Sequence, residues 1–574
     1  MSTRSRSARA VGGLLPVALL AGAISTSAAQ PQSPLRPGQS PGPRFVMSAL
    51  KGEGDGPRLG FQVANAVRER IASEFDMRAL WVVPESTITD YLVRAGYPAD
   101  QPLSTADSRQ LARSFGADEL LNGVVTKTES GGFRVQAAWS LSARDDMVQP
   151  LPAVEATKIS DVAKLVAREF QTARKQVESV QRCVSLARSR NYSGALAEAR
   201  KAIDAYPRSV LGRVCIANIF DQQKLGPDSM LRISNEILGI HPENARALAF
   251  AADAYGEKKM VDEQVRVLEQ LVRVEPSNRR ARIALVNVYA GRDQLDRAKR
   301  LIDTLVAVEP DSGSLALQLR IYLRLKEWAG AVAIGERLID TDTSAATRDL
   351  FVRLIAAADA AGDAQKALDL ATRGVGKFPK DDELVVLRVQ SLRKNGQLPQ
   401  ALAVVNALVE RSPHAPNAWT QKARLEQELG FGADSVLSTL GRGLQNGEDR
   451  ATTALVARSF GVTASKDTVP NKLDPLRTAL RYYKFSATAQ PADTTSMMIG
   501  STSLLLAQRL APEPAEAKRC EPAKEMQGLT TDALIELPKA GLAYPRRVPE
   551  LMALASKWAT YADQLAKSTC TRKD

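Results

Sequence analysis

The apolar positions of residues 44–160 alternate between two periods. One stretch repeats every four residues, as on one face of a helix, and it comprises Leu59, Val63, Val67 and Ile71. Short apolar or alternating runs around it are typical of β-strands. These predicted strands are residues 45–47, 80–83, 119–126 and 133–142, with a further one near Val154. A second helix is expected over 105–115 and a third from Asp161. Residues 44–160 are therefore predicted to form a small α+β domain.

From residue 177 onwards the helical pattern itself repeats. Five prolines end helical stretches at intervals of 34 residues, with one double interval of 69, and they are Pro242, Pro276, Pro310, Pro379 and Pro413. Proline cannot continue a helix, so it marks the turn between repeats. A pair of helices cannot bury its apolar face alone and needs neighbouring pairs. Residues 177–449 are thus predicted to be a stack of about eight helical hairpins.

This repeat resembles the tetratricopeptide repeat (TPR). Counting back from Pro310 at position 32, the family's packing positions 7, 11, 20 and 27 are Leu285, Tyr289, Ala298 and Leu305. Trp419 takes the tryptophan position of a later copy. The resemblance implies an α-solenoid whose groove binds other proteins. The predicted fold is mostly α: a TPR α-solenoid preceded by the small α+β domain, with residues 450–574 as degenerate repeats or a helical C-terminal cap.

A second resemblance concerns the sequence LARSFGADELLNGVV at residues 111–125. It is similar to the amino-terminal domain of TolB and to the related CsgG- and FlgO-like domains. Their pattern is a helix, then Gly-Ala-Asp, then a strand ending in Gly-x-Val, followed by a hairpin. The resemblance implies a domain that contacts other proteins in bacterial envelopes and has no catalytic residues to carry over.

The N-terminal residues have the composition of an export signal. Arg4, Arg6 and Arg9 precede an apolar run at 11–24, and small residues follow at 27–29. Residues 1–29 are predicted to be a cleaved signal peptide, and residues 30–43, with five prolines, an extended linker. We therefore expect a periplasmic or secreted protein without a transmembrane segment in its mature chain.

The overall charge bears on the choice of partner. Lys and Arg number 77 against 64 Asp and Glu, which gives a net charge of +13. This excess favours acidic partners. Export, and the lack of a block of like charges, argue against nucleic acid. The predicted partner is an envelope protein or peptide of acidic character, while the sequence carries no signal for an oligomeric state.

Four cysteines in an oxidising compartment allow three disulfide pairings. The local pairing, Cys183–Cys215 and Cys520–Cys570, keeps each bridge within one structural unit and is the one we predict. Buried free thiols are the alternative.

The groove of a TPR solenoid is formed by the first helix of each pair. Polar residues at groove positions of the clearer copies are the candidate partner-binding residues: Arg246, Asp253, Arg280, Asn287, Arg320, Arg324, Gln390 and Arg393. Arginines and amides there can bind carboxylates or extended backbone. Repeats that clamp a terminal carboxylate have a lysine at position 5. This chain has Ala249, Ile283, Ala316, Val352 and Val386 there, which argues against that activity.

Candidate catalytic chemistry is sparse. The chain has two histidines, and both flank repeat-boundary prolines. No recognisable nucleophile, metal-binding or cofactor motif occurs. The Gly-rich loop 52–60 follows a strand as a phosphate loop would, but it has acidic residues and no Lys-Ser pair. We therefore predict no catalytic site, no metal and no cofactor, and a binding scaffold in place of an enzyme. The alternative is an accessory factor that binds or processes envelope glycan polymers.

Overall fold

The structure is a computed structural model that describes residues 42–53, 57–141, 147–466, 472–511 and 520–570. The predicted signal peptide, and all but the last two residues of the predicted linker, lie outside these ranges. The chain divides into two compact units, the first ending at Glu275 and the second beginning at Pro276.

The first unit begins with a mixed β-sheet of the order β3-β1-β4-β5-β6. Its strands are β1 (Arg44–Met47), β2 (Lys51–Glu53), β3 (Trp81–Val82), β4 (Glu119–Lys127), β5 (Phe133–Leu141), β6 (Val148–Pro150) and β7 (Val154–Ala156). β4 and β5 form the predicted hairpin, in register from Glu119 opposite Leu141 to Lys127 opposite Phe133. β1 runs parallel to both β3 and β4. The short edge strands β2 and β6 were not predicted.

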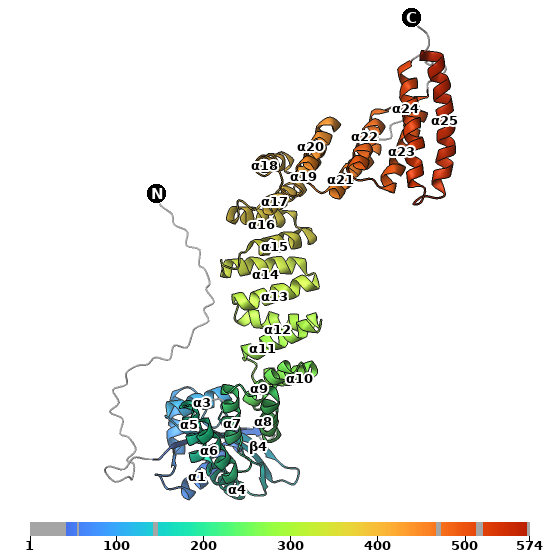
Figure 1. Ribbon diagram of the computed structural model, residues 1–574. Coiled ribbons are helices and arrows are strands. Elements are labelled where there is room, and N and C mark those ends of the chain that lie inside the picture. The colour runs from blue at the N-terminus through green and yellow to red at the C-terminus, as the bar shows by residue number, and fades with distance from the viewer. Residues whose placement is uncertain (1–41, 54–56, 142–146, 467–471, 512–519, 571–574) are drawn as a thin grey trace, which may run out of the picture. The chain divides into compact units, whose positions relative to one another are not determined.

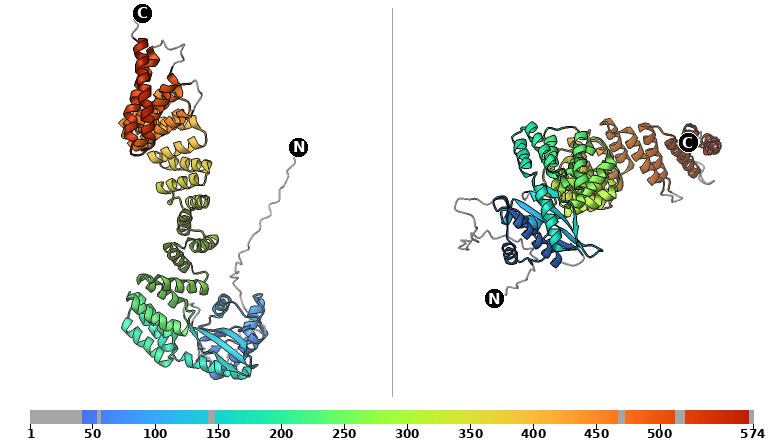
Figure 2. Two further views of the ribbon diagram at one scale, coloured as in Figure 1. Left: turned by 90° about the vertical axis from the view of Figure 1, so that its right-hand side faces the viewer. Right: turned by 90° about the horizontal axis from the view of Figure 1, so that it is seen from below.

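Helices cover both faces of the sheet, because apolar side chains point alternately to either side of a strand. They are α1 (Pro57–Glu74), α2 (Glu85–Arg94), α3 (Thr105–Ser114) and α4 (Ile159–Arg174). Phe45 and Met47 pack with α1 and α4, whereas Val46 packs with α2 and α3. Figure 2 shows the strands with these helices beside them. Helix α2 was not among the predicted elements.

The glycine-rich loop before α1 has a packing role at one described position. A Cβ on Gly60 would lie 1.8 Å from the carbonyl oxygen of Leu50, so a side chain would not fit there. Residues 54–56 of the loop lie outside the described ranges. The described part of the loop is therefore explained by close approach of two backbones.

Three helical pairs complete the first unit. They are α5 (Val177–Arg188), α6 (Tyr192–Ala205), α7 (Val210–Gln222), α8 (Pro227–Ile240), α9 (Ala245–Glu257) and α10 (Val261–Val274). The α+β core continues into them, since Val180, Tyr206 and Leu211 belong to the same buried cluster as Phe45. The disulfide Cys183–Cys215 links α5 to α7.

A buried polar contact reinforces this junction. The Gln149 side chain on β6 is fully buried, and its amide nitrogen donates to the Arg208 carbonyl at 2.9 Å. Its carbonyl oxygen accepts from the Val210 backbone N–H at 2.8 Å. The α+β domain and the first helical pairs are therefore parts of one folded unit.

The second unit begins with five further helical pairs. These are α11 (Arg279–Gly291), α12 (Leu295–Val308), α13 (Ser312–Leu325), α14 (Trp328–Thr341), α15 (Arg348–Ala360), α16 (Ala364–Lys377), α17 (Asp382–Lys394), α18 (Leu398–Arg411), α19 (Ala418–Glu428) and α20 (Ala433–Gln445). Figure 1 shows α11 to α16 stacked one after another.

Each of Pro276, Pro310 and Pro379 is followed closely by the cap of a first helix. Asn278, Asp311 and Asp381 accept backbone N–H groups at the N-termini of α11, α13 and α17. Such caps satisfy donors that a helix end leaves unpaired. The 34-residue period is therefore a repeat of both turn and cap.

The unit ends in a group of longer helices. They are α21 (Arg450–Ser465), α22 (Asp474–Ala489), α23 (Asp493–Leu510), α24 (Cys520–Glu536) and α25 (Arg547–Cys570), with the short 3-10 helix Leu537–Ala540 before α25. The disulfide Cys520–Cys570 joins the start of α24 to the end of α25. Both disulfides are thus of the local pairing. None of the helices in the described ranges combines the length and apolarity that a membrane-crossing helix requires.

Candidate partner-binding surface

The eight candidate residues all lie on first helices of pairs. Arg246 and Asp253 are on α9 of the first unit. The other six belong to the second unit, with Arg280 and Asn287 on α11, Arg320 and Arg324 on α13, and Gln390 and Arg393 on α17. Gln390 and Arg393 are partly buried and the remaining six are exposed.

In the first unit, Arg246 contacts the preceding first helix. Its Nε and one terminal nitrogen donate to the Asn218 side-chain oxygen on α7, at 2.9 and 2.7 Å. The guanidinium also lies over the Phe250 ring, 5.2 Å from its centre. Arg246 is therefore held flat against the helices that surround it.

In the second unit, two arginines of α13 contact α11 in the same manner. Arg320 donates to the Asn287 side-chain oxygen at 2.8 Å. Arg324 donates to the Ala290 carbonyl at 2.6 Å and to the Asp293 carboxylate at 2.8 Å. The prediction placed these residues in one groove, and the structure adds that they bridge successive first helices.

These hydrogen bonds compensate the positive charges of the two arginines to different extents. Arg324 is neutralised in part by Asp293, although exposed pairs of this kind add little stability. Arg320 has an uncharged amide as its partner, so its positive charge is not compensated by that contact. On α15, Arg353 is exposed and makes no hydrogen bond or ion pair with any described residue.

The sequence spacing of the exposed residues on each first helix places their side chains on the same side of that helix. Residues separated by three, four or seven positions lie on the same side of a helix. Along α15, Arg353 shares its side with the exposed Ala356 and Ala360. We call the exposed residues of this side the first-helix face, and it consists of Arg280, Asn287, Arg320, Arg324, Arg353, Ala356, Ala360 and Lys394.

At the end of the stack, α17 and α19 bring two arginines together. Arg393 donates to the Glu428 carboxylate at 2.6 Å. Burial, and then the nearby positive charge of Arg393, lower the pKa of the Arg424 guanidinium. Arg424 was not among the candidates. Its distance of 34 residues from Gln390 could have identified it, because one repeat period separates equivalent positions.

Helix α19 also has an unusual start. Its N-cap residue Asn417 has a left-handed backbone and makes no capping hydrogen bond with its side chain. The Glu448 carboxylate, from the loop after α20, accepts instead from the backbone N–H of Trp419 at 2.6 Å and of Thr420 at 3.1 Å. Burial raises the pKa of Glu448, and the two N–H groups oppose that shift.

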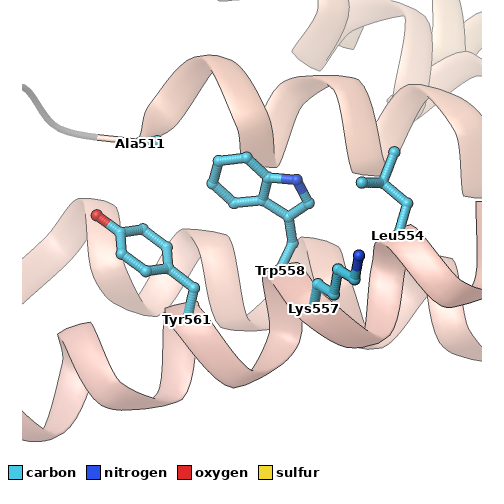
Figure 3. A pocket seen from close by; sticks show the side chains of 5 residues that line it. All are labelled: Ala511, Leu554, Lys557, Trp558 and Tyr561. Atoms are coloured by element: carbon cyan, nitrogen blue, oxygen red, sulfur yellow. The ribbon is translucent and has the colours of Figure 1, made fainter.

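A separate cavity of about 330 Å³ lies on the C-terminal helices. It is lined by Ala511, Leu554, Lys557, Trp558 and Tyr561. The Trp558 ring points towards the helix end that carries Ala511, with Tyr561 one turn further along α25 (Figure 3). The lining is mainly apolar and aromatic, with Lys557 as its one basic group.

Within the described ranges, His, Cys, Asp and Glu side chains do not gather in groups of three that could bind a metal ion. The buried acidic groups instead have structural partners. Glu119, for example, accepts from Trp139 and Arg174 in the core of the first unit.

Comparison with known proteins supports the repeat interpretation. The tetratricopeptide repeat family model matches residues 360–425, which extend from the end of α15 into α19. No curated protein sequence matched the chain. The family match does not reach the α+β domain, whose resemblance to TolB-type envelope domains stays a prediction.

Solved structures match the chain at low identity and low TM-score. They include YrrB, described as a TPR protein with an unusual peptide-binding site, at 16% identity, 34% coverage of this chain, 97% of YrrB and a TM-score of 0.28. PilF of Pseudomonas aeruginosa has 16% identity, 38% and 99% coverage and a TM-score of 0.27. Naa15/Naa10 bound to HypK-THB has 13% identity, 69% and 67% coverage and a TM-score of 0.38.

The predicted fold class is confirmed. The chain has a small α/β region followed by a TPR-type α-solenoid and further helices. Folds of this type are generally scaffolds for contacts between proteins. The fold and the family match together indicate a protein-interaction scaffold.

Proposed function

We propose that this protein is an exported scaffold of the bacterial envelope, which holds an acidic segment of a partner polypeptide on its first-helix face. The α+β domain would provide a separate contact surface, as its TolB-like sequence implies. Export rests on the composition of residues 1–29, and the scaffold role on the solenoid.

The charge of the first-helix face is the observation that supports an acidic partner. Arg320 has only an amide as its described partner, and Arg353 has none in the described ranges. Arginine forks bind carboxylates through two parallel hydrogen bonds. Small residues between them, such as Ala356, leave room for a peptide to approach the helices.

A selection with random peptides tests this function. The full chain, immobilised, is panned against displayed peptides of about twelve residues, which are long enough to span several helices. We expect the bound peptides to be enriched in Asp and Glu. The variant R320E/R353E should bind them at least about tenfold more weakly, since each lost charged contact contributes roughly 1.5 kcal/mol or more.

The matched control reverses two exposed arginines elsewhere. Arg300 on α12 and Arg337 on α14 are exposed on second helices, so R300E/R337E makes the same change in net charge. An equal loss of peptide binding in both variants would show that only the overall positive charge attracts the peptides, and it would refute the proposed face. Salt-sensitive co-sedimentation with cell-wall polymer, without peptide selection, would favour the glycan-binding alternative.

Export has its own test. Cells that produce the full chain are fractionated, and the N-terminus of the protein is sequenced. We expect a periplasmic or secreted product that begins at Gln30. An intact N-terminus in the cytoplasmic fraction would contradict the proposed location, without bearing on peptide binding.

A further inference from the structure

Arg424, in α19, is a charged side chain without a hydrogen-bond partner in the described ranges. It is partly buried, and it donates no hydrogen bond to any described residue. Its Nε is shielded from solvent and unpaired. A guanidinium has five N–H donors, and a shielded donor that lacks an acceptor lowers stability. The residue is therefore poorly explained by the folding of the solenoid alone.

The neighbouring Arg393 also has an unpaired donor, although it makes one ion pair. One terminal nitrogen donates to Glu428 at 2.6 Å, while its Nε is shielded and unpaired. The side chains of Arg393 and Glu428 keep 24% and 39% of their exposure, so solvent and ligands can reach them. Two guanidiniums thus share a single carboxylate at this place.

The surrounding charges do not supply the second carboxylate. Asp359, on α15, is 3.0 Å from the Lys394 ammonium and pairs with it. Glu428 is therefore the carboxylate near both Arg393 and Arg424, whereas Asp359 already pairs with Lys394. Gln390, one repeat period before Arg424, adds an amide at the equivalent position of α17. This local excess of positive charge favours the binding of an anion.

We propose that Arg393 and Arg424 form a seat for an Asp or Glu side chain of the bound partner. This inference rests on the proposed function and assigns it one defined contact. The incoming carboxylate accepts hydrogen bonds from Arg424 and from the free N–H groups of Arg393, and Glu428 keeps Arg393 in place. A chain-terminal carboxylate is not the expected ligand, because Val386 and Thr420 occupy the position where clamping repeats have lysine.

The probe is a fluorescent hexaglutamate peptide with blocked ends, and hexaglutamine is its uncharged counterpart. Binding to the full chain is measured by fluorescence anisotropy at low salt. We expect R424Q and R393Q each to weaken hexaglutamate binding about tenfold, because each removes charge-assisted hydrogen bonds. R424K should recover only part of the binding, since lysine lacks the planar fork. The control R337Q, which removes an exposed arginine of α14, should change binding less than about twofold.

Thermal unfolding without peptide separates a binding role from a structural one. Because Arg424 makes no hydrogen bond with a described residue, R424M should melt at the wild-type temperature or above it. A marked fall in melting temperature would show that the arginine supports the fold and would overturn the proposal. Equal hexaglutamate affinity of R424Q and R337Q would overturn it as well.

The two proposals fail in different ways. If panned peptides bind through Arg320 and Arg353 but R424Q does not affect them, the seat is refuted and the scaffold function stands. If hexaglutamate binding depends on Arg424 and panning selects no peptide, the seat stands and peptide capture along the whole face is refuted. Equal binding of hexaglutamine would refute the carboxylate as the group that is recognised.

Discussion

Arg174 on α4 donates its Nε to both carboxylate oxygens of Glu119 on β4, at 2.9 and 3.0 Å. The Glu119 side chain is 1% exposed, and it also accepts from the Trp139 indole at 3.1 Å. Burial raises the pKa of Glu119, and Arg174 opposes this shift. The pair therefore fastens the last helix of the α+β domain to the start of the central hairpin.

Removing Arg174 should destabilise the α+β domain strongly. In Arg174→Met the Glu119 charge stays buried without its partner, which costs about 3 to 5 kcal/mol. Hydrogen exchange of the β4 and α4 amides in the full chain measures this locally. The double variant E119Q/R174M removes both charges and should recover much of the loss. If the single and double variants exchange alike, the ion pair is not what holds the helix.

The carboxylate that caps α19 predicts a dependence on pH. Burial raises the pKa of Glu448 in the folded state, so its contribution to stability is full below the unfolded pKa and is lost as pH rises through the folded one. Lowering the pH from about 7 to about 4, near the ordinary carboxyl pKa, should therefore stabilise α19 in the wild type relative to Glu448→Gln. Exchange of the α19 amides at both pH values measures the difference. A constant difference between the proteins would contradict the assignment.

The two disulfides should differ in their response to reductant. Cys183 and Cys215 are 0% and 3% exposed, whereas Cys520 and Cys570 are partly exposed. Attack by a thiolate requires access to sulfur. With mild dithiothreitol and an alkylating reagent, mass spectrometry should find Cys520 and Cys570 modified first. Simultaneous modification of all four would show that the first unit opens as readily as the C-terminal helices.

Removing the buried Cys183–Cys215 disulfide should lower the free energy of unfolding by an amount that its loop length predicts. A cross-link across the 32 residues between Cys183 and Cys215 restricts the unfolded chain, so the variant C183A/C215A should lose about 3 to 4 kcal/mol. Thermal unfolding of the full chain, compared with C520A/C570A, measures this. A melting temperature of the first unit equal to wild type would indicate that the bridge adds nothing to packing already present.

The repeat was predictable because each position meets the same neighbours in every copy. Ala298, Ala331, Ala367 and Ala401, spaced near the repeat period, are all fully buried where paired helices cross. Only small side chains fit such crossings, so composition at a fixed interval identifies them. The same reasoning extends to the caps, because Asn278 and Asp381 each follow a repeat proline by two residues.

Contacts between distant segments were not predictable in this way. The seat at Arg393 and Arg424 depends on which donors lack acceptors, and a periodic pattern does not contain that information. Glu448 replaces a cap from 29 residues away, at a helix whose own Asn417 looks like an ordinary N-cap. Strands β2 and β6 have three residues each, too few for an alternating pattern to stand out.

The junction between the α+β domain and the solenoid leads to a prediction about fragments. A fragment of residues 44–160 lacks α4, whose Phe170 is fully buried against Phe45 and Trp139. It also lacks Tyr206 and Leu211, which extend the same core. Residues 44–222 retain all these contacts and the Cys183–Cys215 bridge. We expect the longer fragment to unfold cooperatively and the shorter one to give poorly dispersed amide NMR signals.

A point variant of the longer fragment tests the polar part of that junction. Gln149→Leu leaves the Val210 N–H and the Arg208 carbonyl without their buried partner. Unsatisfied groups of this kind cost about 1 to 3 kcal/mol each, so the melting temperature of 44–222 should fall clearly. Gln136→Leu is the control, because the Gln136 side chain lies on the exposed side of β5. A well-folded 44–160 that is indifferent to Gln149→Leu would instead mean that the domain ends before α4 and that the solenoid is only attached to it.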